Sequence, residues 1–345
     1  MGGWMLYGAN GYTAKLILDL ALKRGHRPVL GGRNRQAIEA LAREHNLPAR
    51  IFGLEEVATA ASALSGIDAV LHCAGPFSAT SAPMLEACLQ AGTHYLDITG
   101  EMEVFAHCHQ ADQRARERGI VVIPGTGFDV VPSDCLAALL KRELPDADAL
   151  VLAFEAGGGP SHGTALTAVE GISKGGRVRV NGHIEAVPLA YKTRSFERDG
   201  EPRHAMTIPW GDVYTAFVST GIPNIEVYMV VPIATSERLR KLNRVRWLLG
   251  LGLVQRWMKG KVRAGGPASA KRDDSACTLW GEVKNAAGKE VKKQLTTVNG
   301  YDLTALTAIG VLDHLLAQHP AGGFYTASQL MGADYILSLP GSSLR

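Results

Sequence analysis

The first 145 residues alternate short apolar runs with stretches in which apolar residues recur every three or four positions. Continuous apolar runs are typical of strands covered on both faces, and the longer spacing is typical of amphipathic helices. The runs predict strands at 4–7, 27–32, 49–52, 68–73, 94–97 and 120–123. The periodic stretches predict helices at 12–24, 35–45, 80–91 and 103–118. Strands that alternate with helices indicate a parallel sheet.

Beyond Pro145 the apolar runs are separated by longer loops that contain Gly and Pro. They predict strands at 149–155, 177–187 and 224–231, a hairpin pairing 275–284 with 290–298, and a helix over 301–317. Strands joined by turns rather than by helical crossovers indicate a largely antiparallel sheet.

The predicted fold is therefore α/β, with an N-terminal Rossmann domain built on a doubly wound parallel sheet and a second, mixed α+β domain. We expect the first domain to span 1–145 and the second to span 146–300. C-terminal helices would occupy 301–345, and whether they pack back on the Rossmann domain stays open at this point.

Composition narrows the class of protein. Hydrophobic residues make up 46% and charged residues 20%, which is the balance of a globular protein, and the net charge of +3 gives no reason to expect a nucleic-acid partner. The five cysteines are scattered without a CxxC pair, which favours reduced thiols in the cytoplasm. The N-terminus lacks a basic region followed by an apolar run, so we expect no signal peptide.

A glycine-containing loop follows the first predicted strand and precedes the first predicted helix. It runs Gly8, Ala9, Asn10, Gly11, Tyr12, Thr13, Ala14. Gly8 would permit a tight turn, Gly11 would let a pyrophosphate approach the backbone, and Ala14 would let helix and strand pack closely. The free N–H groups at the start of the helix would face the phosphates. In this setting the loop predicts a dinucleotide site, although an ordinary turn would have a similar composition.

The end of the second predicted strand discriminates between the two nicotinamide cofactors. NAD sites usually place Asp or Glu there to bind the ribose 2′-hydroxyl. This chain has Gly32, Arg33, Asn34 and Arg35. A guanidinium can hold a 2′-phosphate through two hydrogen bonds, so we predict NADP(H). The alternative is that the arginines only form a solvated helix start.

Five motifs carry a family resemblance. In chain order they are residues 8–13, 32–33, 73–77 (Cys73, Ala74, Gly75, Pro76, Phe77), 95–101 and 127–134. Together they resemble the saccharopine dehydrogenase-like oxidoreductases, which include trans-acting enoyl reductases of lipid synthesis. The resemblance covers the first 135 residues well and the rest loosely. It implies an NADP-binding domain followed by a substrate and dimerisation domain, and hence a homodimer. It does not imply saccharopine as the substrate.

Ligands of open α/β sheets lie at the carboxyl ends of the strands. Cys73, Ala74, Gly75, Pro76 and Phe77 follow the fourth predicted strand, where small residues would let the nicotinamide ribose approach. The catalytic candidates at neighbouring strand ends are Glu101, Asp129 and Tyr95. Glu101 would act as an acid or base if a cleft raised its pKa, but Thr99 and Glu101 would also suit the cap of the helix near 103. Tyr95 would equally suit a core position.

Helix capping explains Ser133 and Asp134 better than catalysis does, whereas Asp129 is less easily explained as a cap. His107 and His109 flank Cys108, but residues two apart on a helix point to different faces, so we expect no metal site.

Residues 237–263 carry nine Lys or Arg residues against one acid, Glu237, around an apolar centre at 247–254. This segment would pack an apolar face on the core or on a dimer mate, or would contact lipid or an anionic substrate.

These observations favour an NADP(H)-dependent oxidoreductase that transfers a hydride to or from C=O, C=N or an activated C=C in a small-molecule or acyl substrate. Short-chain dehydrogenases are excluded, because none of the nine tyrosines is followed by lysine four positions later. The alternative is a non-catalytic NADP(H)-binding sensor or partner subunit.

Overall fold

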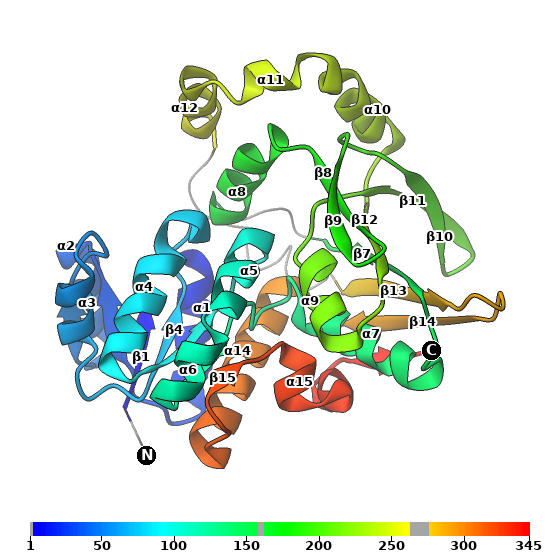
Figure 1. The fold of residues 1–345 in the computed structure, drawn as a ribbon. Helices are drawn as coiled ribbons and strands as arrows, with labels where there is room; N and C mark the ends of the chain where they lie inside the picture. Colours follow the sequence, from blue (N-terminus) through cyan, green and yellow to red (C-terminus); the bar gives the residue numbers. More distant parts are fainter. Residues whose placement is uncertain (1–2, 158–161, 263–275) are drawn as a thin grey trace. The chain divides into compact units, whose positions relative to one another are not determined.

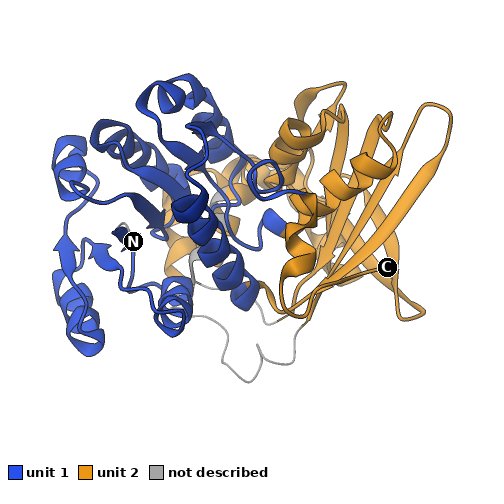
Figure 2. Cartoon of the chain, turned by 90° about the horizontal axis from the view of Figure 1, so that it is seen from below, with its two compact units in different colours: residues 1–131, 301–332 blue, residues 132–300, 333–345 orange. Residues whose placement is uncertain are grey.

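The computed structural model describes residues 3–157, 162–262 and 276–345. The chain divides into two compact units (Figure 2). Unit 1 contains residues 1–131 and 301–332, and unit 2 contains residues 132–300 and 333–345. The C-terminal segment is thus shared, because 301–332 belong to the first unit and 333–345 to the second.

Unit 1 is built on a seven-stranded sheet in the order β15-β6-β5-β4-β1-β2-β3, in which every pairing is parallel. The strands are β1 (Trp4–Tyr7), β2 (Val29–Gly32), β3 (Ala49–Ile51), β4 (Ala69–His72), β5 (His94–Asp97), β6 (Val121–Ile123) and β15 (Gly323–Phe324). The order reverses between β1 and β4, which is the switch point where open α/β sheets bind ligands. The predicted doubly wound sheet is confirmed.

Helices lie between these strands in the sequence (Figure 1). They are α1 (Tyr12–Lys23), α2 (Arg35–His45), α3 (Val57–Ala63), α4 (Phe77–Ala91), α5 (Met102–Gln110) and α6 (Asp112–Arg118), and α14 (Gly300–Gln318) and α15 (Ala327–Met331) follow late in the chain. Helix α1 buries Ala14, Ile17, Leu18 and Ala21, the side chains that the three-to-four spacing places on one face. Helix α14 joins unit 1 in part through Thr304, whose hydroxyl accepts a hydrogen bond from the Phe128 amide at 3.0 Å.

Unit 2 contains a nine-stranded mixed sheet, in which β7 and β12 pair in parallel and the other pairings are antiparallel. Its strands are β7 (Ala149–Glu155), β8 (Gly176–Val180), β9 (His183–Val187), β10 (Thr193–Arg198), β11 (Glu201–Thr207), β12 (Asn224–Val230), β13 (Cys277–Lys284), β14 (Glu290–Thr297) and β16 (Ser343–Leu344). Its longer helices are α7 (Val131–Glu143), α8 (His162–Ile172), α9 (Asp212–Thr220), α10 (Ile233–Leu242) and α12 (Gly252–Gly260). The predicted second, mixed domain is also confirmed.

One face of the unit 2 sheet contacts α7. A Cβ atom added to Gly281 would lie 2.5 Å from Leu140 Cδ1 and 3.0 Å from Leu136 Cδ2. Glycine at this point of β13 therefore lets the helix approach the sheet closely.

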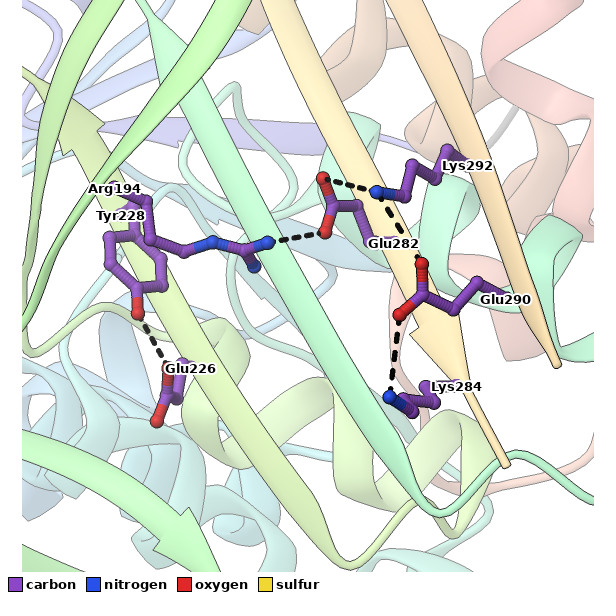
Figure 3. Close-up of polar contacts among 7 residues, drawn as sticks. All are labelled: Arg194, Glu226, Tyr228, Glu282, Lys284, Glu290 and Lys292. Carbon is purple, nitrogen blue, oxygen red and sulfur yellow. Dashed lines mark hydrogen bonds and ion pairs between the residues drawn. The ribbon is translucent and has the colours of Figure 1, made fainter. Parts of the chain in front are cut away.

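On the other face the sheet curls, so that β10 reaches β13 although three strands separate them in the sheet order. The rings of Phe196 and Trp280 are 5.5 Å apart, and Trp280 Nε1 donates to the Glu197 carbonyl at 2.9 Å. Arg194 Nη2 pairs with Glu282 Oε2 at 2.7 Å, and Tyr228 donates to Glu226 on β12 (Figure 3). The curl thus closes over a small aromatic cluster with charged pairs at its border.

Among the described residues no helix has both the length and the apolar character that crossing a bilayer requires.

Candidate functional site

The loop between β1 and α1 depends on glycine at its first position. Gly8 has φ of +79°, and a Cβ atom there would lie 2.8 Å from both the amide nitrogen and the Cβ of Ala74. The Gly8 amide donates to the Gly31 carbonyl at 2.8 Å. Any side chain at Gly8 would therefore strain the backbone and displace the loop after β4.

The N-terminus of α1 suits a pyrophosphate. Gly11 occupies the N-cap and has no side chain with which to cap the helix, and none of the first-turn residues is acidic. A Cβ at Gly11 would lie 3.2 Å from the Gly8 carbonyl oxygen, so the glycine keeps the loop open on that side. The helix dipole favours an anion at this end. The predicted loop residues Asn10, Tyr12 and Thr13 lie at the same helix start.

The end of β2 carries a cation where NAD-binding sites carry an acid. Arg33 is exposed, and its charge lowers the pKa of Tyr7, whereas burial and the charge of Glu55 together raise that pKa to about 12. Asn10 Oδ1 lies 4.0 Å from the position of a Cβ on Gly32. Asn10 and Arg33 therefore lie beside the same strand end, an arrangement that fits a ribose with a 2′-phosphate.

The two other polar residues predicted here have partners within α2. Asn34 Oδ1 accepts a hydrogen bond from the Ala37 amide at 3.1 Å and caps the helix. Arg35 Nη1 pairs with Glu39 Oε1 at 2.9 Å. Arg33 is therefore the best placed of the three polar side chains to hold the cofactor.

Hydrogen bonds of Thr80 and the buried His72 hold the loop after β4 in place. The Thr80 hydroxyl donates to the Ala74 carbonyl at 2.7 Å and lies 3.0 Å from His72 Nε2. Burial lowers the pKa of His72 to about 3, so its ring is neutral. Because the Thr80 hydroxyl donates its proton to the Ala74 carbonyl, its oxygen must accept a hydrogen bond from His72 Nε2. The neutral His72 ring therefore carries its proton on Nε2 and none on Nδ1. Nδ1 is buried and has no partner among the described residues.

Glu101 binds the end of this loop where α4 begins. Its Oε1 accepts from the Phe77 amide and its Oε2 from the Ser78 amide, each at 3.0 Å, so the carboxylate caps α4. The alternative role that the sequence left open for Glu101 was to cap the helix that begins near residue 103. Glu101 does occupy the N-cap of α5, but its side chain makes no cap hydrogen bond there. The Glu101 carboxylate thus places a negative charge at the N-terminus of α4, where the helix dipole stabilises it.

Asp129 lies against Gly100. A Cβ at Gly100 would come within 2.9 Å of Asp129 Oδ2, so the absence of a side chain makes room for the carboxyl. Burial raises the pKa of Asp129 to about 7, and the neighbouring charge of Glu101 adds to the rise. The structure thus brings two of the three predicted catalytic residues together, one of them with a raised pKa.

Tyr95, the third candidate, is fully buried and donates to Asp97 Oδ2 at 2.5 Å. Asp97 Oδ1 accepts from the amides of Thr99 at 2.9 Å and Gly125 at 2.8 Å. Burial raises the pKa of Asp97 to about 6, although these hydrogen bonds oppose the rise. Asp97, which sequence reasoning did not single out, therefore ties the ends of β5 and β6 together.

Ser133 and Asp134 do not occupy the N-cap that the sequence predicts for them, because α7 begins at Val131 and both residues lie within it. Asp134 Oδ1 instead accepts from Ser219 Oγ at 2.7 Å. In α5, His109 stacks on Phe324 with ring centroids 4.6 Å apart, while Cys108 is buried. In the parts of the chain described, no three His, Cys, Asp or Glu residues are arranged to hold a metal ion.

Comparison with known proteins agrees with this geometry. Residues 4–123 match the model of the saccharopine dehydrogenase NADP-binding domain. A Mycobacterium tuberculosis protein, named provisionally as a trans-acting enoyl reductase, is 31% identical over 185 residues, which cover 49% of this chain and 44% of that protein. An Arabidopsis thaliana protein, named provisionally as a mitochondrial saccharopine dehydrogenase-like oxidoreductase, is 31% identical over 148 residues, or 38% of this chain and 32% of that protein. The matches thus span less than half the length of either relative.

Among solved structures, apo saccharopine dehydrogenase (L-Glu forming) from Saccharomyces cerevisiae is similar over the whole chain. The TM-score is 0.66 with 11% identity, and the match covers 100% of this chain and 99% of that one. At this identity the match shows the fold and not the activity. The family match confirms a nicotinamide dinucleotide as the cofactor class, and it agrees with the glycine loop and with Arg33. Residues 4–123 are therefore similar to saccharopine dehydrogenase NADP-binding domains.

Proposed function

We propose that the protein is an NADP(H)-dependent oxidoreductase that moves a hydride to or from a C=O, C=N or activated C=C group. The observation that carries the proposal is a carboxyl group with a pKa near neutrality, Asp129, beside a second carboxylate, Glu101, close to strand ends of a dinucleotide-binding sheet. A group of this kind can release and take up a proton at the pH of the cell. The oxidoreductase names of the two relatives support the same class of reaction.

The residues that would hold the cofactor come from three loops of unit 1. They are Gly8, Asn10, Gly11, Tyr12 and Thr13 for the pyrophosphate, Arg33 with Asn34 and Arg35 for the 2′-phosphate, and Cys73, Ala74, Gly75, Pro76 and Phe77 for the nicotinamide ribose. When bound, the nicotinamide supplies or accepts the hydride. The protein contributes position, exclusion of water and a proton.

Asp129 is the proposed proton donor for reduction, because hydride addition to C=O or C=N leaves a heteroatom that must take up a proton. Glu101 has a different proposed role. Its carboxylate is held by two amides of α4, so it positions the loop at 73–77 and keeps a negative charge close to Asp129. That charge helps to keep the proton on Asp129. Tyr95 is the weaker candidate, because its hydroxyl is already bound to Asp97.

For the partners, we propose a small-molecule or acyl substrate, with an enoyl thioester as the first to test. We also propose a homodimer, and lipid contact through residues 237–263. Unit 2 would provide the substrate and dimerisation surfaces, a role assigned by analogy with the family.

The test follows the absorbance of NADPH while the pure protein is mixed with enoyl thioesters, cyclic imines and keto acids in turn. Consumption that requires one substrate class, and that falls when Asp129 is replaced by Asn, supports the proposal. Calorimetric titration with NADPH and NADH is run in parallel. Tight NADPH binding without turnover of any compound would favour the second candidate, a non-catalytic sensor or partner subunit, and NADH binding more tightly than NADPH would refute the cofactor assignment.

A further inference from the structure

A run of helices in unit 2 displays apolar side chains outward. Helices α10, α11 (Arg246–Leu249) and α12 follow one another along one side of the unit (Figure 1). Helix α12 is attached to α8 by Gln255, whose Nε2 donates to the Val169 carbonyl at 3.1 Å and to the Leu249 carbonyl at 2.6 Å. The inner side of α12 is therefore already occupied within unit 2.

The three most exposed large apolar residues of the described chain lie on α11 and α12. Trp247 is 71% exposed, Leu253 is 77% exposed and Trp257 is 66% exposed, and Leu251 between them is 48% exposed. The sequence left open that the apolar centre of this segment packs on the core. The structure contradicts that alternative for Trp247, Leu251 and Leu253, which belong to this centre. Exposed apolar residues gathered on one short segment indicate a contact surface.

Exposed cations lie on the same run of helices. Besides Arg240 they are Arg238, Lys241, Arg244, Arg256 and Lys261, the last with its Nζ 5.9 Å from the centre of the Trp257 ring, and Glu237 is the one acid between residues 237 and 262. Two further arginines serve unit 2 itself, since Arg240 Nε donates to the Ala190 carbonyl at 3.0 Å and the side chain of Arg246 fills the space beside Gly175. The exposed side chains of this run of helices are thus both apolar and strongly positive.

We propose that this surface, formed by Trp247, Leu251, Leu253 and Trp257 with the exposed cations of the same run of helices, binds the surface of an anionic lipid bilayer. Tryptophan favours the boundary between headgroups and acyl chains, and lysine and arginine are attracted to anionic headgroups. The mode is interfacial rather than spanning, as in helices that lie in the membrane plane. The proposal does not depend on the oxidoreductase activity.

Charge also decides against a second copy of the chain as the occupant. A twofold dimer through this surface would place each patch against its own copy, so that cations would face cations with Glu237 as the one acid within the segment to offset them. Like charges brought together at an interface oppose association. An anionic bilayer supplies the opposite charge and an apolar layer at once.

The test uses the full chain with phosphatidylcholine vesicles, with and without phosphatidylglycerol. We expect co-sedimentation with the anionic vesicles only, weakening as salt is raised, together with a blue shift of tryptophan fluorescence. Trp4 and Trp280 are buried and Trp210 is half-buried, whereas Trp247 and Trp257 are exposed, so the shift reports mainly on these two.

Two double variants separate the two components of binding. Arg256→Glu with Lys261→Glu should weaken binding by roughly tenfold or more, and Trp247→Ala with Trp257→Ala should abolish the blue shift and weaken binding. Tyr191→Ala, which changes a residue of unit 2 that is 45% exposed and outside this surface, is the matched control and should bind as the parent does. All these sites are exposed, so thermal unfolding should be unchanged, which checks that the variants fold.

No binding to anionic vesicles at low salt would overturn the proposal, and so would equal binding by parent and both double variants. A dimer detected by light scattering in solution that both double variants abolish would assign the surface to a second copy instead. None of these results depends on NADPH turnover, so failure here and failure of the proposed function are distinguishable.

Discussion

Asp129→Asn replaces a carboxyl that burial keeps protonated with an amide of nearly the same shape. The structure raises the pKa of this carboxyl from 3.8 to about 7. Each pKa unit corresponds to 1.36 kcal/mol, so the shift corresponds to at most about 4 kcal/mol of native-state stability. The side chain is partly exposed, and solvent screening reduces the figure to about 2–4 kcal/mol.

The direction in which the free energy of unfolding changes with pH follows from the difference in Asp129 pKa between the folded and unfolded states. A carboxyl whose pKa is raised on folding contributes stability that is complete below the unfolded value of 3.8 and is lost as the pH rises through about 7. Asparagine does not titrate. We therefore expect the variant to match the parent in strong acid and to exceed its unfolding free energy by about 2–4 kcal/mol at about pH 8.

Urea unfolding of parent and variant at about pH 5 and at about pH 8 measures the difference. Asp97 also titrates in this range, but it is present in both proteins and cancels in the comparison. Asp19→Asn, on the exposed side of α1, is the matched control for the exchange of a carboxyl for an amide. A gain for Asp129→Asn that is equal at both pH values would refute the assignment of a raised pKa.

The same variant tests the proposed chemistry. With a substrate in hand, we expect turnover to fall by roughly 10²–10⁴ while the affinity for NADPH is kept, because only the proton donor is lost. Reduction by the parent should decline as the pH rises through about 7, and the variant should lack this decline. Unchanged turnover would remove Asp129 from the mechanism.

Three further substitutions test the contacts of Glu101 with α4, the proposed role of Arg33 and the geometry of the loop at Gly8. Glu101→Ala removes two charge-assisted hydrogen bonds from the start of α4 and should lower the unfolding free energy in urea by about 2–4 kcal/mol, with Glu101→Gln losing less; equal stability of all three proteins would contradict these contacts. Arg33→Ala should weaken NADPH binding about tenfold or more in calorimetry and leave NADH binding nearly unchanged, whereas an equal loss for both would place the arginine elsewhere. Gly8→Ala should cost about 1–3 kcal/mol in thermal unfolding and impair binding of both cofactors, because its Cβ would meet Ala74 at 2.8 Å; a fully stable variant that binds normally would contradict this loop geometry.

Most elements of the first sheet could be predicted because their signals are local. Strand β1 is apolar throughout, β4 is apolar up to His72 at its end, and the glycine loop lies directly between a strand and a helix. Strand β15 could not be found in this way. It is two residues long and pairs with β6, about two hundred positions earlier in the chain, so no local periodicity reports it.

The hairpin β10–β11 was missed for a different reason. Arg194 and Arg198 alternate with Phe196 on β10, and charged residues in such positions normally indicate an exposed, irregular segment. In the curled sheet these arginines pair with Glu282 and Glu155 across the fold. A sequence pattern cannot show that a distant strand supplies the opposite charges.

Sequence reasoning named Glu101 and Asp129 from their places after two strands, but it could not assign different roles to them. The difference comes from their neighbours. Glu101 accepts hydrogen bonds from two helix amides, which favour its charged form, whereas Asp129 is half-buried beside that charge and so favours its neutral form. Asp97 is buried as well, but hydrogen bonds from the Tyr95 hydroxyl and two amides oppose the rise of its pKa. For Asp129, burial and the Glu101 charge both raise the pKa, and this difference is why we propose Asp129 as the acid.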